Sequence, residues 1–384
     1  MMVIRSSLLV LLGALLLGAC SGKAKVREPA ELKKIEAPAI KAKKVWSRSA
    51  GKGADDRFAG LRVVPAPDAV FTADVNGQVF ALDPANGKPI WTAETGTRLI
   101  SGPSLSGAAA FIGTLDAEVV ALARADGAEL WRATLSSEVL APPVSDGNVV
   151  VARTVDGRIY GLSAVDGEQL WVVDRSVPSL TLRGLAEPVL FAGAAMIGMD
   201  NGRILAIRLE DGQPIWEQVV AVPAGRTELE RITDVDGDLL VSPNGVYAVS
   251  FGGELAAVRT ESGEVQWRRS IRSYTGVTPF DGLALVSDEA GVVWALDAET
   301  GAAAWKQEDL QYRQLSQPVR FGEYVVVADF EGYLHWLAPR DGRIVGRTRI
   351  ARDSLVTAPI AYEGRLYSLA GNGKLSVVEA KPAS

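Results

Sequence analysis

One short phrase recurs along this chain and decides what it can fold into. An aliphatic residue is followed five residues later by a glycine and, four residues after that, by a tryptophan. The aliphatic residues are Leu82, Leu122, Leu162, Ile207, Val258, Leu296 and Leu337. The glycines are Gly87, Gly127, Gly167, Gly212, Gly263, Gly301 and Gly342. The tryptophans are Trp91, Trp131, Trp171, Trp216, Trp267 and Trp305, and the seventh copy has Gly346 in that place. Such fixed spacing indicates repeated structural units.

Each copy carries the marks of β-hairpins. Five residues before the aliphatic residue lies a second turn, such as Asn76-Gly77, Asp156-Gly157 or Asn201-Gly202. Asn-Gly and Asp-Gly pairs favour tight turns in which both central residues have positive φ. The glycine of the main phrase suits the left-handed position of a longer, bulged loop. Four short strands in about 40 residues is the pattern of a β-propeller blade.

The two ends of the chain complement each other. Asn372-Gly373 and Leu375 to Val378 repeat the inner part of a unit, but the chain ends before a glycine and tryptophan can follow. Val45-Trp46 supplies the missing tryptophan strand. We therefore predict an all-β fold: an eight-bladed β-propeller of four-stranded antiparallel blades over residues 45–384, with the N-terminal strand completing the last blade. Each tryptophan would pack between neighbouring blades and bury about 150–250 Å².

The N-terminus reads as a targeting segment. Arg5 precedes an apolar run from Leu8 to Leu17, and Gly18-Ala19-Cys20 follows. Small residues before a cysteine resemble the bacterial lipobox, in which the cysteine is acylated and becomes the new N-terminus. The alternatives are an ordinary signal peptide or a buried helix. We predict a lipoprotein signal peptide over residues 1–19 and lipidation of Cys20, which is the one cysteine of the chain. By the lipoprotein rule, Ser21 instead of aspartate implies the periplasmic face of the outer membrane.

Residues 20–44 are predicted to form the lipidated end and a flexible tether. Gly, Pro, Ala and charged residues dominate this stretch, with few aromatic or β-branched side chains. A passive spacer is the preferred interpretation and a recognition element is the alternative. The first 44 residues carry a balance of +6, so the remaining 340 carry −12 of the total of −6. This acidic body gives no reason to expect nucleic acid as a partner.

The repeat resembles that of two families. Ala295-Leu296-Asp297-Ala298-Glu299-Thr300-Gly301 with Trp305 is similar to the tryptophan-docking repeat of quinoprotein dehydrogenases, which bind pyrroloquinoline quinone. The BamB family of outer-membrane lipoproteins uses the same repeat without the cofactor. Three more specific stretches resemble BamB: Pro178 to Gly184, Ile232 to Asp236 and Glu331 to Trp336. That resemblance implies a non-catalytic scaffold of the outer-membrane β-barrel assembly machine. It would bind the periplasmic domains of BamA and help to deliver and insert unfolded β-barrel substrates.

The residues needed for enzymatic chemistry are sparse. The chain has one cysteine and one histidine, His335, which lies in an alternating strand pattern where a structural role is the simpler interpretation. Triads and zinc clusters need residues that the sequence lacks. Asp234-Val235-Asp236-Gly237-Asp238 resembles the start of a calcium loop, but its glycine comes fourth instead of sixth. We therefore predict no catalytic, metal or cofactor-binding residue; a quinoprotein-like enzyme with a degenerate site, or a propeller that binds another periplasmic ligand, is the alternative.

Two irregularities in spacing indicate where a partner would bind. From each tryptophan to the next hairpin glycine the usual count is 24 to 27 residues, but it is 31 from Trp171 and 37 from Trp216. The count from Trp46 to Gly77 is also 31, but that gap crosses the closure of the ring and carries less weight. Both insertions would join the last strand of one blade to the first strand of the next, on one face of neighbouring blades. Their side chains could cover the core locally or contact a partner. We predict a BamA-binding surface that is composed of Leu180, Leu182, Arg183, Asp234 and Asp236.

Overall fold

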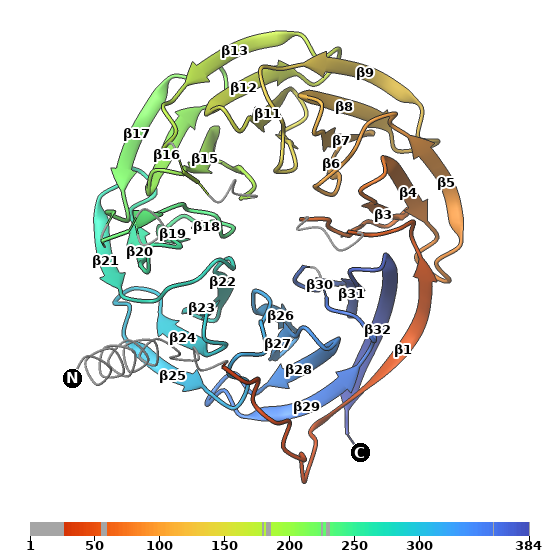
Figure 1. Ribbon diagram of the computed structural model, residues 1–384, viewed down its shortest axis with the longest axis vertical. Coiled ribbons are helices and arrows are strands. Elements are labelled where there is room, and N and C mark those ends of the chain that lie inside the picture. Colours follow the sequence, from red (N-terminus) through yellow and green to blue (C-terminus); the bar gives the residue numbers. More distant parts are fainter. Residues whose placement is uncertain are drawn as a thin grey trace, which may run out of the picture.

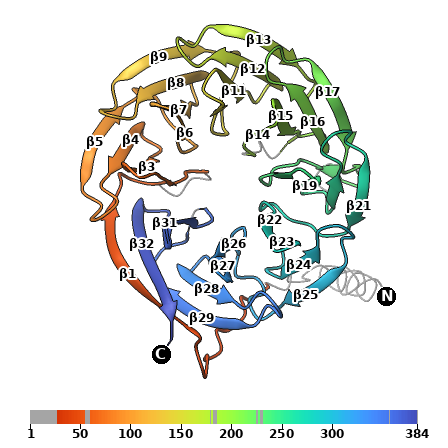
Figure 2. The ribbon, with the colours of Figure 1, turned by 180° about the vertical axis from the view of Figure 1, so that it is seen from behind.

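The computed structural model of the protein describes residues 27–54, 60–178, 180–181, 186–223, 226–227, 231–355 and 357–383. In this part of the chain, strands and turns form eight sheets arranged as a ring around a central axis (Figure 1). Figure 2 shows the same ring from behind. The eight-bladed β-propeller is confirmed. No helix among the described residues is long and apolar enough to cross a membrane.

Blades 1 to 4 each take four consecutive strands, the innermost first. Blade 1 comprises β2 (Val64–Pro65), β3 (Val70–Ala73), β4 (Gln78–Leu82) and β5 (Pro89–Glu94). Blade 2 comprises β6 (Ser104–Ser106), β7 (Ala109–Gly113), β8 (Glu118–Ala123) and β9 (Glu129–Thr134). Blade 3 comprises β10 (Val144–Ser145), β11 (Val149–Arg153), β12 (Arg158–Ser163) and β13 (Gln169–Asp174). Blade 4 comprises β14 (Val189–Phe191), β15 (Ala194–Gly198), β16 (Arg203–Arg208) and β17 (Pro214–Val219).

Blades 5 to 7 follow the same plan, and all neighbouring strands are antiparallel. Blade 5 comprises β18 (Leu240–Ser242), β19 (Gly245–Val249), β20 (Leu255–Val258) and β21 (Val265–Arg269). Blade 6 comprises β22 (Thr278–Phe280), β23 (Leu283–Ser287), β24 (Val293–Asp297) and β25 (Ala303–Gln307). Blade 7 comprises β26 (Val319–Phe321), β27 (Tyr324–Ala328), β28 (Tyr333–Leu337) and β29 (Ile344–Arg349).

Blade 8 joins the two ends of the chain. Its inner strands are β30 (Ile360–Tyr362), β31 (Arg365–Leu369) and β32 (Lys374–Pro382), and its outermost strand is β1 (Ile40–Ser49). β1 and β32 are antiparallel, with Trp46 opposite Val377. The prediction that the N-terminal strand completes the last blade is confirmed. Because this pairing closes the circle, it protects the two sheet edges that an open ring would expose.

Seven tryptophans join neighbouring blades at seven of the eight joints. The indole Nε1 of each one donates a hydrogen bond of 2.7–3.1 Å to a backbone carbonyl in the outer turn of the following blade. The donors are Trp46, Trp91, Trp131, Trp171, Trp216, Trp267 and Trp305, and the acceptors in the same order are Pro84, Arg124, Ala164, Leu209, Thr260, Ala298 and Pro339. The indoles therefore pack between blades, as the repeat predicts.

The repeated glycine serves this joint as well as its own turn. Gly127 has φ of +77°, and a Cβ atom there would lie 2.6 Å from Cε3 of Trp91 in the preceding blade. Contacts of the same kind relate Gly87 to Trp46, Gly167 to Trp131, Gly212 to Trp171, Gly263 to Trp216, Gly301 to Trp267 and Gly342 to Trp305. A side chain at this position would collide with the indole. A glycine is therefore needed both for the positive φ of its own turn and for the close contact with the indole of the preceding blade.

The inner turns differ from the predicted tight hairpins. Gly77 has φ of +99°, but Asn76 is not among the residues with positive φ. The turn spans one more residue, because Asp74 N donates to Gln78 O at 2.9 Å and the Asp74 carboxylate accepts from the backbone N–H groups of both Asn76 and Gln78 at 3.0 Å. The expectation of two left-handed central residues was therefore wrong for this turn. The aspartate before the turn stabilises the wider loop.

The joint between blades 7 and 8 explains Gly346. Blade 8 has no outer turn on which an indole could dock, because its third and fourth strands come from opposite ends of the chain. Instead, Ile40 lies against Gly346, where an added Cβ would be 3.1 Å from the Cβ of Ile40, and Ala39 N donates to Val345 O at 2.8 Å. Ile40 is buried beside Trp336. The N-terminal strand thus occupies the space that a tryptophan fills at the other joints.

The chain before β1 lies on the rim of the ring. Ala30 N donates to Gln311 O at 2.9 Å, and Arg347 donates to Lys33 O at 3.0 Å. Leu32 packs against the apolar cluster between blades 6 and 7. The predicted boundary at residue 45 falls inside β1, which begins at Ile40. Residues 27–39, which the sequence analysis assigned to the tether, are therefore held by blades 6 and 7.

The contact between glycine and indole predicts that two glycine-to-alanine variants differ in stability. Gly127→Ala and Gly107→Ala both place a side chain at positive φ, which costs about 1–2 kcal/mol. Only the Cβ at residue 127 collides with an indole, since nothing lies within 4 Å of one at residue 107. We expect Gly127→Ala to lower the free energy of unfolding by about 1–3 kcal/mol more than Gly107→Ala. Urea unfolding measures both, and equal losses would contradict the docking role of the glycine.

Candidate partner-binding site

The two long loops lie where the spacing predicts. The first joins β13 of blade 3 to β14 of blade 4, and the second joins β17 of blade 4 to β18 of blade 5. The first packs over Gly157, which is in the turn between the second and third strands of blade 3, through the carbonyl of Arg175. The second packs over the corresponding turns of blades 4 and 5, since Val220 N donates to Gly202 O at 2.9 Å and Phe251 N donates to Asp234 O at 3.0 Å. Both loops therefore lie on the same face of the ring.

The predicted site residues differ in how they are placed. Leu180 has 42% of its surface exposed, which leaves an apolar side chain available for contact. In the second loop Val222 is 63% exposed, so each loop presents at least one exposed aliphatic side chain. Leu182 and Arg183 lie outside the described residues. Asp234 is buried and Asp236 is partly buried, so neither carboxylate is an exposed part of the predicted surface.

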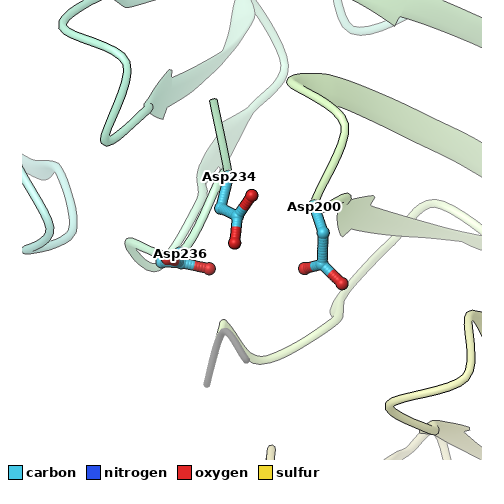
Figure 3. A group of neighbouring side chains, drawn as sticks. All are labelled: Asp200, Asp234 and Asp236. Atoms are coloured by element: carbon cyan, nitrogen blue, oxygen red, sulfur yellow. The ribbon is translucent and has the colours of Figure 1, made fainter. Parts of the chain in front are cut away.

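Asp234 and Asp236 come together with a third carboxylate. Their side chains and that of Asp200, which follows β15, each place an oxygen atom within 4.8 Å of the others (Figure 3). Arg153 at the end of β11 forms a buried ion pair with Asp200 and donates to Gly198 O at 2.9 Å. The cluster therefore connects blade 3, the hairpin turn of blade 4 and the loop that leads into blade 5. It holds the second loop in position.

The charges within this acidic cluster change the pKa of Asp236. The pKa of Asp236 is raised to about 7, chiefly by burial and also by the charges of Asp234 and Asp200, whereas Arg153 lowers it. Three carboxylates supply only part of the six to eight oxygen ligands that Ca²⁺ takes. The cluster accommodates its charge in another way, through Arg153 and a proton that Asp236 retains near neutral pH.

A second charged group crosses the centre of the ring. Arg62, which precedes β2 of blade 1, forms ion pairs with Glu187 before β14 at 2.5 Å and with Asp238 before β18 at 2.7 Å. Blades 1 and 5 are opposite each other in an eight-bladed ring, and the segment before β3 reaches toward the axis in Figure 1. Both long loops therefore end at residues that form ion pairs with Arg62 from blade 1.

The charges of this group depend on one another. Burial alone lowers the pKa of Arg62, but Asp238 and Glu187 raise it overall, so the guanidinium stays charged. The pKa of Glu187 is raised to about 7, chiefly by burial and also by the charge of Asp238, whereas Arg62 lowers it. The sequence does not predict this group, because Glu187 and Asp238 lie 125 and 176 residues from Arg62 and no local pattern marks them. No signal in a single sequence relates them.

His335 has the structural role that its strand pattern suggests. The ring is fully buried in blade 7, where Nε2 donates to Asp329 at 2.9 Å and Nδ1 accepts from Arg347 Nε at 3.2 Å. Burial lowers the pKa of His335, so the imidazole is neutral. Arg313 also binds Asp329 at 2.8 Å. This network lies in a different part of the ring from the two long loops, and it holds the carbonyl groups of Ala30 and Lys33 through its arginines.

Known proteins resemble this chain along most of its length. The family model described as "Outer membrane protein assembly factor BamB" matches residues 38–108 and 75–307. A relative of that name from Alkalilimnicola ehrlichii is 46% identical over 376 residues, which is 97% of each chain. The crystal structure of BamB from Moraxella catarrhalis has a TM-score of 0.80 at 29% identity, and the match covers 88% of this chain and 99% of that chain.

An enzyme shares the architecture at much lower identity. The quinohemoprotein alcohol dehydrogenase from Comamonas testosteroni has a TM-score of 0.71 at 12% identity, and the match covers 88% of this chain and 76% of that chain. At this identity the likeness concerns the fold alone. In this chain the guanidinium of Arg62 lies between opposite blades and forms ion pairs with two carboxylates of the chain itself.

The Asp236 carboxyl predicts a pH dependence of stability. Its pKa of about 7 lies above the unfolded value near 3.9, so the folded state binds the extra proton. Stability from this group is complete below about pH 4 and is lost as pH rises toward 7. We expect Asp236→Asn to reduce this slope, leaving the part that Glu187 contributes, and to raise the free energy of unfolding at pH 8 by on the order of 2 kcal/mol relative to wild type. Urea unfolding between pH 5 and pH 8 measures it. Glu210→Gln, in an exposed turn of blade 4, is the control, and a wild-type slope in Asp236→Asn would contradict the assignment.

The ion pairs of Arg62 predict that replacing its two carboxylate partners restores stability that is lost when Arg62 alone is replaced. Arg62→Gln leaves two partly buried carboxylates without their counter-ion, so we expect a loss of about 1–3 kcal/mol in unfolding free energy at pH 8. Adding Glu187→Gln and Asp238→Asn removes those charges and should restore much of the loss. Thermal unfolding of the single and triple variants tests this. Equal stability of the two would show that the ion pairs across the centre do not stabilise the fold.

Proposed function

The chain belongs to the BamB family, and from this membership we propose that it acts as a non-catalytic scaffold of the machine that assembles β-barrel proteins in the outer membrane. The observation that carries the proposal is identity to proteins named assembly factors across nearly the whole chain. The closed ring supports a scaffold role, because each blade is fixed to its neighbours and the loops are presented from a rigid frame. The single histidine is buried and bonded to charged partners, which gives it no access to a substrate.

The partner of this scaffold would be the periplasmic domains of BamA. The proposed contact surface comprises the two long loops on one face of blades 3 to 5. Leu180 supports it as an exposed apolar anchor, and Leu182 and Arg183 follow in the same loop outside the described residues. An apolar centre beside charged groups is what a specific protein interface needs.

The two aspartates would serve this surface indirectly. Asp234 is buried and accepts a backbone hydrogen bond from Phe251, while Asp236 lies in the cluster with Asp200. We propose that both aspartates are positioning residues that set the shape of the second loop. Their replacement would then weaken binding by moving the loop, even where the partner does not touch either carboxylate.

Attachment to the membrane would come from the N-terminus. Residues 1–19 as a signal peptide and Cys20 as the lipidated residue both lie outside the described residues, and the sequence pattern alone supports them. Several acyl chains provide firm anchoring, since each buried methylene contributes about 0.8 kcal/mol. With Ser21 after the cysteine, the body would be held at the periplasmic face of the outer membrane.

A second role, in handling unfolded barrel strands, has one observation in its favour. The outermost strands of blades 1 to 4 place an aliphatic residue directly before each tryptophan, and about half of its surface is exposed. These residues are Ile90, Leu130, Leu170 and Ile215. A barrel strand alternates apolar and polar residues, so it could pair with such a strand edge and cover the aliphatic side chain.

A matched pair of leucines tests the BamA surface. Leu180 and Leu170 are similarly exposed, at 42% and 50%, but only Leu180 lies in the first long loop. We expect Leu180→Ala to weaken binding to purified BamA periplasmic domains by roughly tenfold or more, as for a buried interface anchor, and Leu170→Ala to leave it unchanged. Leu180→Ala combined with Arg183→Ala should abolish the pull-down without altering the unfolding curve. Unchanged capture by this double variant would remove the site assignment.

A further inference from the structure

A concentration of positive charge marks the strand pair that closes the ring. β1 and β32 lie at the outer edge of the ring beside the C-terminus in both views (Figures 1 and 2). Together they carry six cationic residues and a single carboxylate, that of Glu379. The cationic residues are Lys41, Lys43, Lys44, Arg48, Lys374 and Lys381, and all are exposed. We call this strand pair the lysine ribbon. It contrasts with the rest of the folded body, which is acidic.

Three of these lysines share one face of the ribbon. Lys41 is directly opposite Lys381, and Lys43 is two residues further along the same strand. Like charges directly opposite each other destabilise a strand pair. Glu379 is opposite Lys43, but its carboxylate is bound by Arg365 at 3.3 Å. Within the described part of the chain none of the three lysines forms an ion pair. The fold therefore brings positive charges together and leaves them for an external anion.

The lysine ribbon lies close along the chain to the proposed lipid anchor. Residues 27–39 are held against blades 6 and 7 and lead directly into β1. Lys33 adds an ion pair of 2.6 Å to Asp309, and Arg27 stacks on the ring of Tyr312 at 5.5 Å. Six residues separate Cys20 from Arg27. A fully extended chain of this length spans at most about 25 Å. An anchor at Cys20 would thus keep the rim of blades 6 to 8 near the bilayer.

We propose that the lysine ribbon binds the anionic phospholipid headgroups of the membrane that holds the lipid anchor. The inference rests on the proposed lipidation and extends it, because it assigns the ring an orientation. The ring would stand with the rim of blade 8 on the membrane. Blade 4, which is opposite in an eight-bladed ring, would then point away with the two long loops beside it. Each lysine near an anionic surface adds roughly 1 kcal/mol of attraction, so the ribbon orients a body that the acyl chains alone would leave free to turn.

Site-specific labelling of the full lipidated protein in vesicles tests the orientation. Because Cys20 is the one cysteine, Pro382→Cys and Glu210→Cys each introduce a unique thiol for a fluorophore. Residue 382 ends the lysine ribbon, and residue 210 is in an exposed turn of blade 4. The vesicles contain phosphatidylcholine with or without phosphatidylglycerol, and a headgroup-attached quencher reports proximity. We expect strong quenching at residue 382 only with phosphatidylglycerol, and weak quenching at residue 210 in both vesicles.

Two triple variants distinguish binding by the lysine ribbon from a general effect of the protein's net charge. Lys41→Gln with Lys43→Gln and Lys381→Gln should abolish the phosphatidylglycerol-dependent quenching at residue 382. Lys88→Gln with Arg98→Gln and Arg259→Gln removes as much charge from blades 1, 2 and 5 and should leave it intact. Salt at 1 M, where the screening length is about 3 Å, should also abolish it.

The outcomes separate this inference from the lipid anchor itself. If the protein fails to sediment with phosphatidylcholine vesicles, the proposed lipidation is wrong. If it sediments but both labelled positions are quenched equally, or if the two triple variants behave alike, the lysine ribbon does not bind headgroups and the orientation is wrong.

Discussion

The contact between an indole and a bare glycine of the next blade is the interaction on which the ring depends. At seven joints an indole donates to a backbone carbonyl and covers the glycine that makes its neighbour's turn. Because the same contact recurs at a fixed place, each blade takes a similar orientation to the next. The ring can then close without strain at one joint. Ile40 and Gly346 replace this contact where the chain ends meet, and the strand pairing of β1 with β32 supplies the missing connection.

A ring held in this way allows its loops to vary without loss of the frame. The two long loops at blades 3 to 5 are tied to that frame through charged groups. Arg153 reaches the acidic cluster from the neighbouring blade, and Arg62 reaches the ends of both loops from across the centre. Asp236 and Glu187 keep pKa values of about 7 in these groups. The loops are therefore positioned by buried charge, while the exposed Leu180 remains available to a partner.

The parts of this structure that could be predicted are those that repeat. The spacing of glycine and tryptophan predicts eight blades, and the incomplete last copy predicts the closure by the N-terminal strand. The positions of both long loops follow from counting alone. The wider turn at Asn76-Gly77 was not predicted, because the capping carboxylate of Asp74 competes with the tight turn that the pair favours. Burial of Asp234 was missed for another reason. A run of acidic residues is predicted to be exposed unless its buried charged neighbours are known. Here those neighbours, Asp200 and Arg153, lie in other blades.

The central functional claim is that the loops of blades 3 to 5 are where this chain meets BamA. Photo-crosslinking in intact cells tests it most directly, with a crosslinking amino acid at residue 180 or at residue 170 of the lipidated protein. Mass spectrometry of the products identifies whatever is attached. The account predicts a BamA adduct from position 180 and none from position 170. A BamA adduct from position 170 alone, or a different protein captured at position 180, would contradict it.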